Sequence, residues 1–394
     1  MSCSGFTSHT TIVLTAVGLA VTATTLPAQT PSAAAVEAFA DSAAALALQK
    51  GPIPSLSISV VRGPQTLLKK AYGYADLEND VLATPVTEYR IGSDTKQFTA
   101  AAIMRLVEQG KLHLDDDVRP FFPNFPFGSR HVTVRQLLTH TSGIANYTVH
   151  LDRFQREHLS HDSLLAKVND KPFDFEPGSA SRYSNTGYYM LGVIIEKVSG
   201  RSYKDYVQQE FFTPLGLTQT LYCSVEPLVE HRAQGYDTKD GKFVNADYID
   251  MDLPFAAGSL CSTPSDLVKW SQALREGRVV SAASYRQMAT PGVLNGGKPF
   301  TPAYGFGLGI ADLEGHRSVS HGGGINGFTA SLSTYPSDSL YVVVLSNVSG
   351  PGARQMAMFS QGLSRFVLGL PPAPPLPAPP AVPSKPATPA QRKQ

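Results

Sequence analysis

A serine and a lysine three residues apart, Ser93 and Lys96, have the side-chain types and spacing for covalent chemistry. The apolar spacing of residues 98–107, ended by Gly110, predicts a helix that begins near Ser93. Three residues are about one helical turn, so the amine and the hydroxyl share a face, and a buried lysine could act as base or electrostatic partner to the serine. The N–H groups at a helix start favour negative charge that develops there. Alone, so short a motif more often marks an N-cap serine and a solvated lysine, because four-residue patterns recur by accident in long chains.

The segments that must position this pair change from strands to helices and back to strands. Residues 33–50 predict an amphipathic helix. Residues 55–60 alternate polar and apolar side chains, which predicts a strand with one covered face, and residues 66–74 would complete a hairpin with it. Predicted helices follow, among them one capped by Thr133, residues 188–198 and a helix that begins near residue 264, whereas residues 218–252 show no clear period.

The last third of the chain predicts an antiparallel meander and a final helix. The predicted strands are residues 304–310, 317–321, 328–335 and 340–346, and the helix is residues 353–368. Strands from both chain ends imply an α+β fold: one antiparallel sheet flanked by helices, with an all-helical lobe inserted. We expect a sheet lobe of residues 33–92 and 255–369 and a helical lobe of residues 110–215. Ser93 then lies at the junction, where pockets usually form.

Composition limits the classes of partner. The 394 residues carry a net charge of +1, so no basic field indicates nucleic acid, and we expect a small-molecule or short-peptide substrate. No cofactor or metal is expected. His158 and His161 have a spacing that a metal could use, but their surroundings are strongly polar and favour a solvated helix face. Residues 322–327 match Gly-x-Gly-x-x-Gly, yet a predicted strand follows them instead of the helix that a dinucleotide site needs. The oligomeric state is not indicated.

The N-terminal residues predict export, and the C-terminal residues predict a tail outside the folded domain. Residues 12–21 are uncharged and apolar, and small residues up to Ala28 follow, which favours a signal peptide of residues 1–28 and a periplasmic or secreted protein without a stable transmembrane anchor. No Lys or Arg precedes the apolar run, so an uncleaved N-terminal tail is the alternative. Residues 29–369 would be the folded domain, and residues 370–394, rich in Pro and Ala, a disordered or polyproline-like tail.

The cysteines leave two alternatives. Cys3 would depart with the signal peptide, and Cys223 and Cys261 remain. Two cysteines of an exported protein form one disulfide or stay as two buried thiols, and the sequence allows both.

Three motifs together resemble a known family. They are Ser93-Asp94-Thr95-Lys96, Tyr183-Ser184-Asn185 and His321-Gly322-Gly323. In this order and spacing they resemble the serine β-lactamase and penicillin-binding protein family, in the branch of class C β-lactamases, D-alanyl-D-alanine carboxypeptidases, D-aminopeptidases and esterases. Supporting stretches extend the likeness from about Val36 to Leu368: residues 137–143, 183–191, 214–217 and 257–263.

The resemblance implies roles for the motif residues. Ser93 would be the acylated nucleophile, Lys96 its hydrogen-bonded partner and Tyr183 the general base and acid. The substrate-binding and oxyanion positions would be Asn185, His321, Gly323 and Gly324. The two oxyanion donors among these would be the N–H groups of Ser93 and Gly324.

One departure from the family pattern affects specificity. Where many β-lactamases have Lys-Thr-Gly, this chain has His321-Gly322-Gly323, so a permanent cation and a hydroxyl that help to bind substrate carboxylates are missing. His321 is cationic or neutral near neutral pH and could replace part of that charge.

The resemblance therefore implies an exported serine hydrolase that works through an acyl-enzyme on a β-lactam or a D-amino-acid peptide amide. A carboxylesterase for small acyl esters is the alternative within enzymes. A non-catalytic penicillin-binding-like module is the alternative of another class.

Overall fold

The computed structural model describes Met1 and residues 30–224 and 226–373. The predicted signal peptide and nearly all of the predicted tail lie outside the described residues. Within those residues, no helix is long and apolar enough to cross a membrane.

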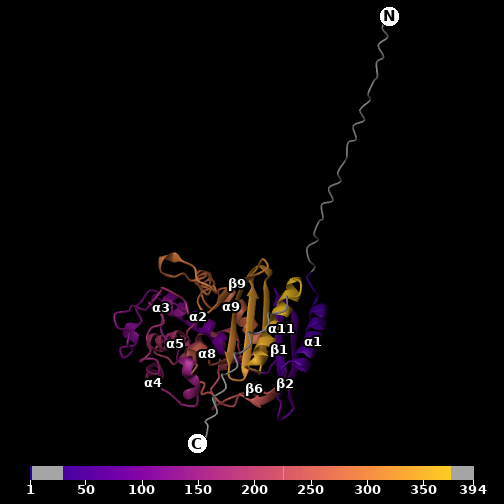
Figure 1. Ribbon diagram of the computed structural model, residues 1–394, viewed down its shortest axis with the longest axis horizontal. Coiled ribbons are helices and arrows are strands. Elements are labelled where there is room, and N and C mark those ends of the chain that lie inside the picture. Colours follow the sequence, from indigo (N-terminus) through magenta and orange to yellow (C-terminus); the bar gives the residue numbers. More distant parts are fainter. Residues whose placement is uncertain (2–29, 225, 374–394) are drawn as a thin grey trace.

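A seven-stranded antiparallel sheet forms the centre of the fold, in the order β3-β2-β1-β12-β11-β10-β9 (Figure 1). Its strands are β1 (Ser55–Arg62), β2 (Gln65–Asp76), β3 (Val81–Leu82), β9 (Gly309–Leu313), β10 (His316–Ile325), β11 (Phe328–Tyr335) and β12 (Leu340–Ser346). Strand β1 joins the two chain ends, because Ile58 lies opposite Lys70 of β2 and opposite Val344 of β12. This confirms the predicted α+β fold with one sheet built from both ends of the chain.

Helices cover both faces of this sheet (Figure 1). α1 (Ala33–Lys50) and α11 (Pro351–Leu368) pack on one face over a core that includes Val36, Leu56 and Leu363. α2 (Thr95–Glu108) and α9 (Pro264–Arg275) belong to the larger core between the other face and the helical part of the chain, where Phe98 stacks on Trp270 with ring centroids 3.9 Å apart.

Shorter elements complete the chain. The remaining helices are α3 (Val134–Leu138), α4 (His161–Ala166), α5 (Asn185–Ser199), α6 (Tyr203–Val207), α7 (Thr213–Leu215), α8 (Phe255–Gly258) and α10 (Ala282–Met288). Single turns and short irregular helices are η1 (Gly92–Asp94), η2 (Arg119–Phe121), η3 (Tyr147–Arg153), η4 (Gln208–Phe212), η5 (Asn295–Gly297) and η6 (Pro336–Asp338). Two small sheets contain β4 (Tyr89–Arg90), β5 (Leu221–Tyr222) and β8 (Leu260–Ser262), and β6 (Tyr236–Lys239) with β7 (Lys242–Asn245).

Several sequence predictions of elements were wrong. β1 is covered on both faces, because its serines are buried and hydrogen-bonded: Ser55 donates to Asn347 Oδ1 at 2.6 Å and lies 2.9 Å from the Tyr89 hydroxyl. The strand predicted at residues 304–310 begins only at Gly309, and β10 extends to Ile325. The segment without a period contains β5, β6 and β7, which are too short for an alternating pattern to stand out.

The structure resolves the alternatives for the cysteines. Cys223 and Cys261 form a disulfide, with Cα atoms 5.2 Å apart. Cys261 belongs to β8, which pairs with β4 directly before Ser93. The bridge therefore lies beside the turn that carries the predicted nucleophile.

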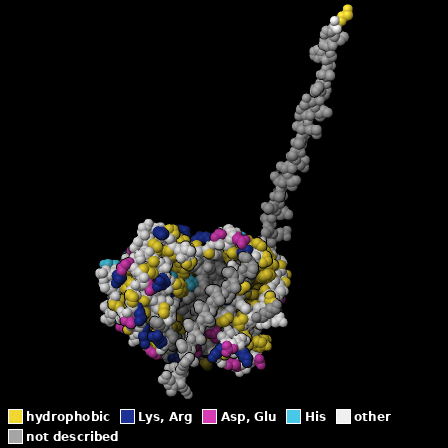
Figure 2. Space-filling model, in the orientation of Figure 1, with side chains coloured by type: hydrophobic (Ala, Val, Ile, Leu, Met, Phe, Trp, Pro, Cys, Tyr) yellow, Lys and Arg dark blue, Asp and Glu magenta, His cyan; other side chains and the backbone are white. Residues whose placement is uncertain are grey.

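The surface in Figure 2 carries no dominant charge. Lys and Arg side chains lie among Asp, Glu and hydrophobic side chains over the described part of this face. This agrees with the net charge of +1.

Candidate active site

Ser93 lies in η1, the single turn that leads from β4 into α2. Two glycines allow this turn to lie against β10. Gly92 has φ +49°, and a Cβ there would come within 2.9 Å of the Gly324 carbonyl oxygen, while a Cβ on Gly323 would lie 1.8 Å from the Ile91 carbonyl oxygen. Only residues without a side chain permit this approach, which places Ser93 beside the strand.

Lys96 lies in the first turn of α2, fully buried, with its amine directed at Ser93. Its Nζ lies 3.1 Å from Ser93 Oγ, 2.7 Å from Asn185 Oδ1 and 2.8 Å from the Ala257 carbonyl oxygen. Burial holds the pKa of Lys96 well below its usual range, while the nearby Asp94 acts in the opposite direction. The neutral amine is therefore favoured.

The hydrogen bonds orient that neutral amine. A neutral –NH2 group has two N–H donors and one lone pair. Ala257 O can only accept, and Asn185 Oδ1 also accepts, because the amide nitrogen of Asn185 donates to Thr148 Oγ1 at 3.2 Å. Both N–H bonds are thus used, and the lone pair is left for the Ser93 hydroxyl. The arrangement is that of a proton acceptor aimed at a nucleophile.

Tyr183 lies opposite Lys96, in the loop before α5. Its side chain makes a hydrogen bond with Ser93, and Lys96 Nζ lies 4.8 Å from its ring centroid. Desolvation raises the pKa of the Tyr183 hydroxyl and the hydrogen bond with Ser93 lowers it, although 41% of the residue remains exposed. The hydroxyl is placed to exchange a proton with groups bound at Ser93.

Asn185 is held by the start of α5. Ser184 caps this helix by accepting the Gly187 N–H, and the Asn185 N–H donates to Asn146 Oδ1 at 3.2 Å. The polar cap and the apolar positions that follow it fix the direction of the Asn185 side chain toward Lys96.

The wall on the other side of Ser93 is the edge of β10. Strand β9 pairs with β10 only from His316 to Ser320, so within the described residues the stretch 321–325 has no strand partner on that edge. Gly323 is buried against η1, while Gly324 is exposed and a Cβ there would meet nothing within 4 Å. An open backbone edge next to Ser93 is where a substrate could pair and where an oxyanion could find N–H donors.

His321 is neutral in this structure. Burial is the largest cause that lowers its pKa to about 3, and a protonated Lys96 would act in the same direction. Its Nδ1 lies 2.7 Å from the Gly322 carbonyl oxygen, which can only accept, so Nδ1 carries the proton. Nε2, 2.9 Å from the Tyr304 hydroxyl, therefore accepts from Tyr304. Of the two charge states that the sequence left open, the structure favours the neutral one.

Asp94, next to the nucleophile, is an unusual buried acid. It is fully buried, and neither carboxyl oxygen has a hydrogen-bond partner among the described residues. Burial raises its pKa well above the usual range, and Lys96 acts against this shift. The nearest ionisable partner on β10 is His321, whose Nδ1 lies 3.8 Å from Asp94 Oδ1.

The comparisons with known proteins agree with this geometry. The model of the family described as Beta-lactamase matches residues 34–362. The chain belongs to the Beta-lactamase family. A Bacillus subtilis relative named "Putative penicillin-binding protein PbpX" is 31% identical over 289 residues, which cover 73% of this chain and 69% of the relative. "Protein flp" of Staphylococcus aureus is 30% identical over 312 residues, and the match spans 77% of this chain but 61% of that protein.

Several solved structures share the fold of this chain. A structure of "the octameric penicillin-binding protein homologue from Pyrococcus abyssi" is 32% identical with a TM-score of 0.72, covering 86% of this chain and 77% of that one. A D-amino acid amidase from Ochrobactrum anthropi SV3 is 25% identical with a TM-score of 0.73, covering 85% and 97%. A D-stereospecific amidohydrolase from Streptomyces sp. is 26% identical with a TM-score of 0.70, covering 81% and 97%.

Within this Beta-lactamase-family site, sequence reasoning missed three contributors. The Ala257 carbonyl carries no signal in its residue type. The sequence predicts Tyr304 in a strand, but β9 begins only at Gly309. The contact of Tyr304 with His321 was therefore not predicted. His140, in a stretch already noted for its likeness to the family, packs against Tyr183 with ring centroids 4.3 Å apart. Its Nδ1 accepts a hydrogen bond from the Ser184 N–H at 3.2 Å. Its motif could have indicated it.

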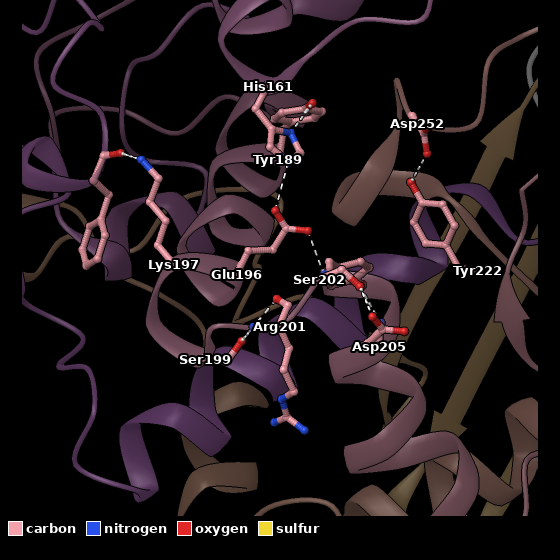
Figure 3. Close-up of polar contacts among 12 residues, drawn as sticks. His161, Tyr189, Glu196, Lys197, Ser199, Arg201, Ser202, Asp205, Tyr222 and Asp252 are labelled. Atoms are coloured by element: carbon pink, nitrogen blue, oxygen red, sulfur yellow. Dashed lines mark hydrogen bonds and ion pairs between the residues drawn. The ribbon is translucent and has the colours of Figure 1, made fainter.

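The histidines considered as metal ligands do not act together. His161 lies 2.7 Å from the Tyr189 hydroxyl through Nδ1 and 3.0 Å from Glu196 Oε2 through Nε2 (Figure 3). His158 instead faces Asp250 and Asp252.

Proposed function

We propose that this protein hydrolyses amide or ester bonds through an acyl-enzyme on Ser93. The carrying observation is the position of the Lys96 amine: buried, 3.1 Å from Ser93 Oγ, with its two N–H bonds used by Asn185 and Ala257. A serine hydroxyl is a weak nucleophile until a neighbouring base accepts its proton. A neutral lysine in this geometry supplies that base.

In acylation, the Ser93 oxygen forms a bond to the substrate carbonyl carbon while the hydroxyl proton moves to Lys96. Negative charge develops on the carbonyl oxygen, and we assign the N–H groups of Ser93 and Gly324 to stabilise it. The bond to the leaving nitrogen or oxygen then breaks, and that atom takes a proton delivered from Lys96 through the Tyr183 hydroxyl. The products are an ester on Ser93 and a free amine or alcohol.

Deacylation uses the same groups in reverse order. Water attacks the ester carbon, its proton passes to the Tyr183 and Lys96 pair, and the Ser93 oxygen leaves and recovers a proton. The carboxylic acid product departs and the site returns to its starting protonation state.

For the substrate, we propose a D-amino-acid amide or peptide, or a β-lactam. Two structural neighbours are named as a D-amino acid amidase and a D-stereospecific amidohydrolase, which supports an amide with D configuration. A carboxylesterase activity on small esters is the second candidate. The neutral His321 favours it, because a small neutral ester has no carboxylate that a cation of the protein would have to bind. Export to the periplasm or outside the cell remains part of the proposal and rests on residues 12–28.

One experiment separates these activities. Wild-type protein and Ser93→Ala are incubated with a fluorescent penicillin, a p-nitrophenyl ester and D-phenylalanine amide, and both turnover and the mass of the adduct on Ser93 are measured. We expect an adduct on wild type only and a loss of roughly 10^4-fold or more in turnover for Ser93→Ala, since the atom that forms the covalent bond is gone. Ser129→Ala, at an exposed position outside any helix or strand, controls for the substitution itself.

Each outcome assigns a class. Amide turnover supports the leading proposal, and turnover of the ester alone supports the esterase. Absence of any adduct and of any turnover would leave the non-catalytic module. Retention of a tenth of wild-type activity by Ser93→Ala would overturn the mechanism.

A further inference from the structure

Three side chains outside the active site converge on one point. His158 follows η3, and Asp250 and Asp252 lie in the loop before α8. One ligand atom from each lies within 4.8 Å of the others. His158 Nδ1 is 3.4 Å from Asp250 Oδ2 and 3.4 Å from Asp252 Oδ2.

These distances match the edges of a metal coordination shell. A hydrogen bond from an imidazole N–H to a carboxylate is usually about 2.7–2.9 Å long, so 3.4 Å is long for one. Two ligands bound tetrahedrally to one ion at about 2.1 Å lie roughly 3.4 Å from each other. The two nitrogen-to-oxygen separations therefore equal those of ligands that share an ion, and the two carboxylate oxygens lie within 4.8 Å of each other.

Both carboxylates are already oriented by their other oxygen. Asp250 Oδ1 accepts the Asp252 N–H at 2.9 Å, and Asp252 Oδ1 accepts the Tyr222 hydroxyl at 3.0 Å (Figure 3). Both Oδ2 atoms are thus left toward His158. Outer hydrogen bonds that fix the ligands in this way are typical of protein metal sites. Tyr222 is itself firmly placed, because it is buried and precedes the disulfide cysteine Cys223.

We propose that His158, Asp250 and Asp252 bind a divalent transition-metal ion that prefers mixed nitrogen and oxygen ligands, with Zn²⁺ as its representative. Mixed imidazole and carboxylate ligands suit such ions. Water would complete the coordination from the cavity of ≈ 390 Å³ that His158 and Asp252 line. The same cavity is lined by Lys204, the cation that faces it, and by His161, which is engaged by Tyr189 and Glu196.

The ion would strengthen an existing connection between two chain segments. The Asp250 N–H already donates to the Gln155 carbonyl oxygen at 2.8 Å, so the two segments lie side by side. The loop of Asp250 and Asp252 leads into α8, whose Ala257 carbonyl accepts from Lys96. The site is therefore a structural clamp behind the catalytic lysine, and its ligands are distinct from the residues assigned to catalysis.

Zinc binding is measured on the full chain, freed of metal, by competition with a chromogenic zinc chelator and by the shift of Tm with added ZnCl2. We expect one Zn²⁺ per chain and a rise in Tm, because an ion that binds only the folded state stabilises it. His158→Ala and Asp252→Asn should each weaken binding at least 10-fold. Tyr222→Phe should weaken it about 10-fold without removing a ligand.

His131→Ala is the matched control. His131 is likewise exposed and lies 3.0 Å from Asp117, but it has one carboxylate and a competing Arg119 beside it. Its replacement should leave zinc affinity unchanged. A wild-type chain that binds no Zn²⁺, or variants at His158 and Asp252 with wild-type affinity, would overturn the proposal.

Discussion

Lys96 and Ala257, distant in the sequence, are joined by a hydrogen bond of 2.8 Å from the amine to the carbonyl oxygen. The bond matters because a carbonyl oxygen can only accept, so one N–H of the amine must point at Ala257. The lone pair of a neutral Lys96 is then left for Ser93. Short helix α8 thus helps to orient the Lys96 amine through its backbone alone.

The first prediction concerns the pH profile. A base must be unprotonated, so kcat/KM should rise as pH increases through the pKa of Lys96. Because burial holds this pKa well below 10.5, the profile should reach its plateau well below pH 10. Lys96→Ala should lose roughly 10^3-fold or more. Lys269→Ala, at an exposed lysine bonded to Asp266, should keep the wild-type profile. A rising limb centred near pH 10 in the wild type would contradict the neutral base.

The sequence predicts those parts of the fold that have a clear period. Strands β11 and β12 begin and end where alternation and turn residues place them, and α1 spans the predicted residues. The alternation in β1 wrongly predicted one solvent-exposed face. Ser55 is buried because its partners Tyr89 and Asn347 come from distant segments that no local period indicates.

In the candidate site, too, the features with a local sequence signal were predicted, and those that depend on distant segments were not. Side-chain motifs bring Ser93, Lys96, Tyr183 and Asn185 together, as their order and spacing suggested. The charge state of His321 could not be predicted, since it depends mainly on how deeply the fold buries this side chain. Backbone acceptors such as Ala257 O depend on the path of the chain and not on residue type.

The second prediction concerns stability and Asp94. Its pKa is raised in the folded state, so the folded protein keeps a proton that the unfolded chain loses above about pH 4. Stability from this group is therefore present at low pH and is lost as pH rises toward the folded-state pKa, by up to about 1.4 kcal/mol per pH unit. Asp94→Asn should remove this loss.

Urea denaturation at pH 5 and pH 8 measures it. The variant should gain stability over the wild type at pH 8 relative to pH 5. Asp162→Asn, at an exposed aspartate, controls for removal of one negative charge. An equal difference between Asp94→Asn and wild type at both pH values would show that Asp94 is ionised in the folded state.

The third prediction concerns the disulfide. The bridged cysteines are separated by 38 residues, and closing a loop of this length stabilises by about 4 kcal/mol in the chain-entropy account. The double variant Cys223→Ala, Cys261→Ala should be less stable by up to this amount in denaturant titrations. Peptide mapping without reduction should recover one linked peptide pair. Alkylation of both cysteines in unreduced protein would refute the bridge and leave the catalytic argument intact.

The last prediction concerns His321, which stands where the resemblance to β-lactamases leads us to expect a lysine. With its pKa lowered to about 3, wild-type His321 should contribute no limb to the pH profile between pH 5 and 9. His321→Lys should introduce a cation at a buried position, where it attracts substrate carboxylates more strongly than it would in water. The kcat/KM for a cephalosporin relative to that for a neutral ester should rise about ten-fold, or about 1.4 kcal/mol.

The burial that lowers the pKa of His321 acts on a lysine in the same place. Desolvation disfavours the charged amine, so the new lysine should lose its proton within the accessible pH range. The gain for the cephalosporin should therefore be larger at pH 6 than at pH 9. His321→Gln, which stays neutral, should leave the ratio unchanged at both pH values. If His321→Lys also leaves the ratio unchanged at pH 6, position 321 does not face the substrate carboxylate, and the missing cation would not explain the substrate choice of this protein.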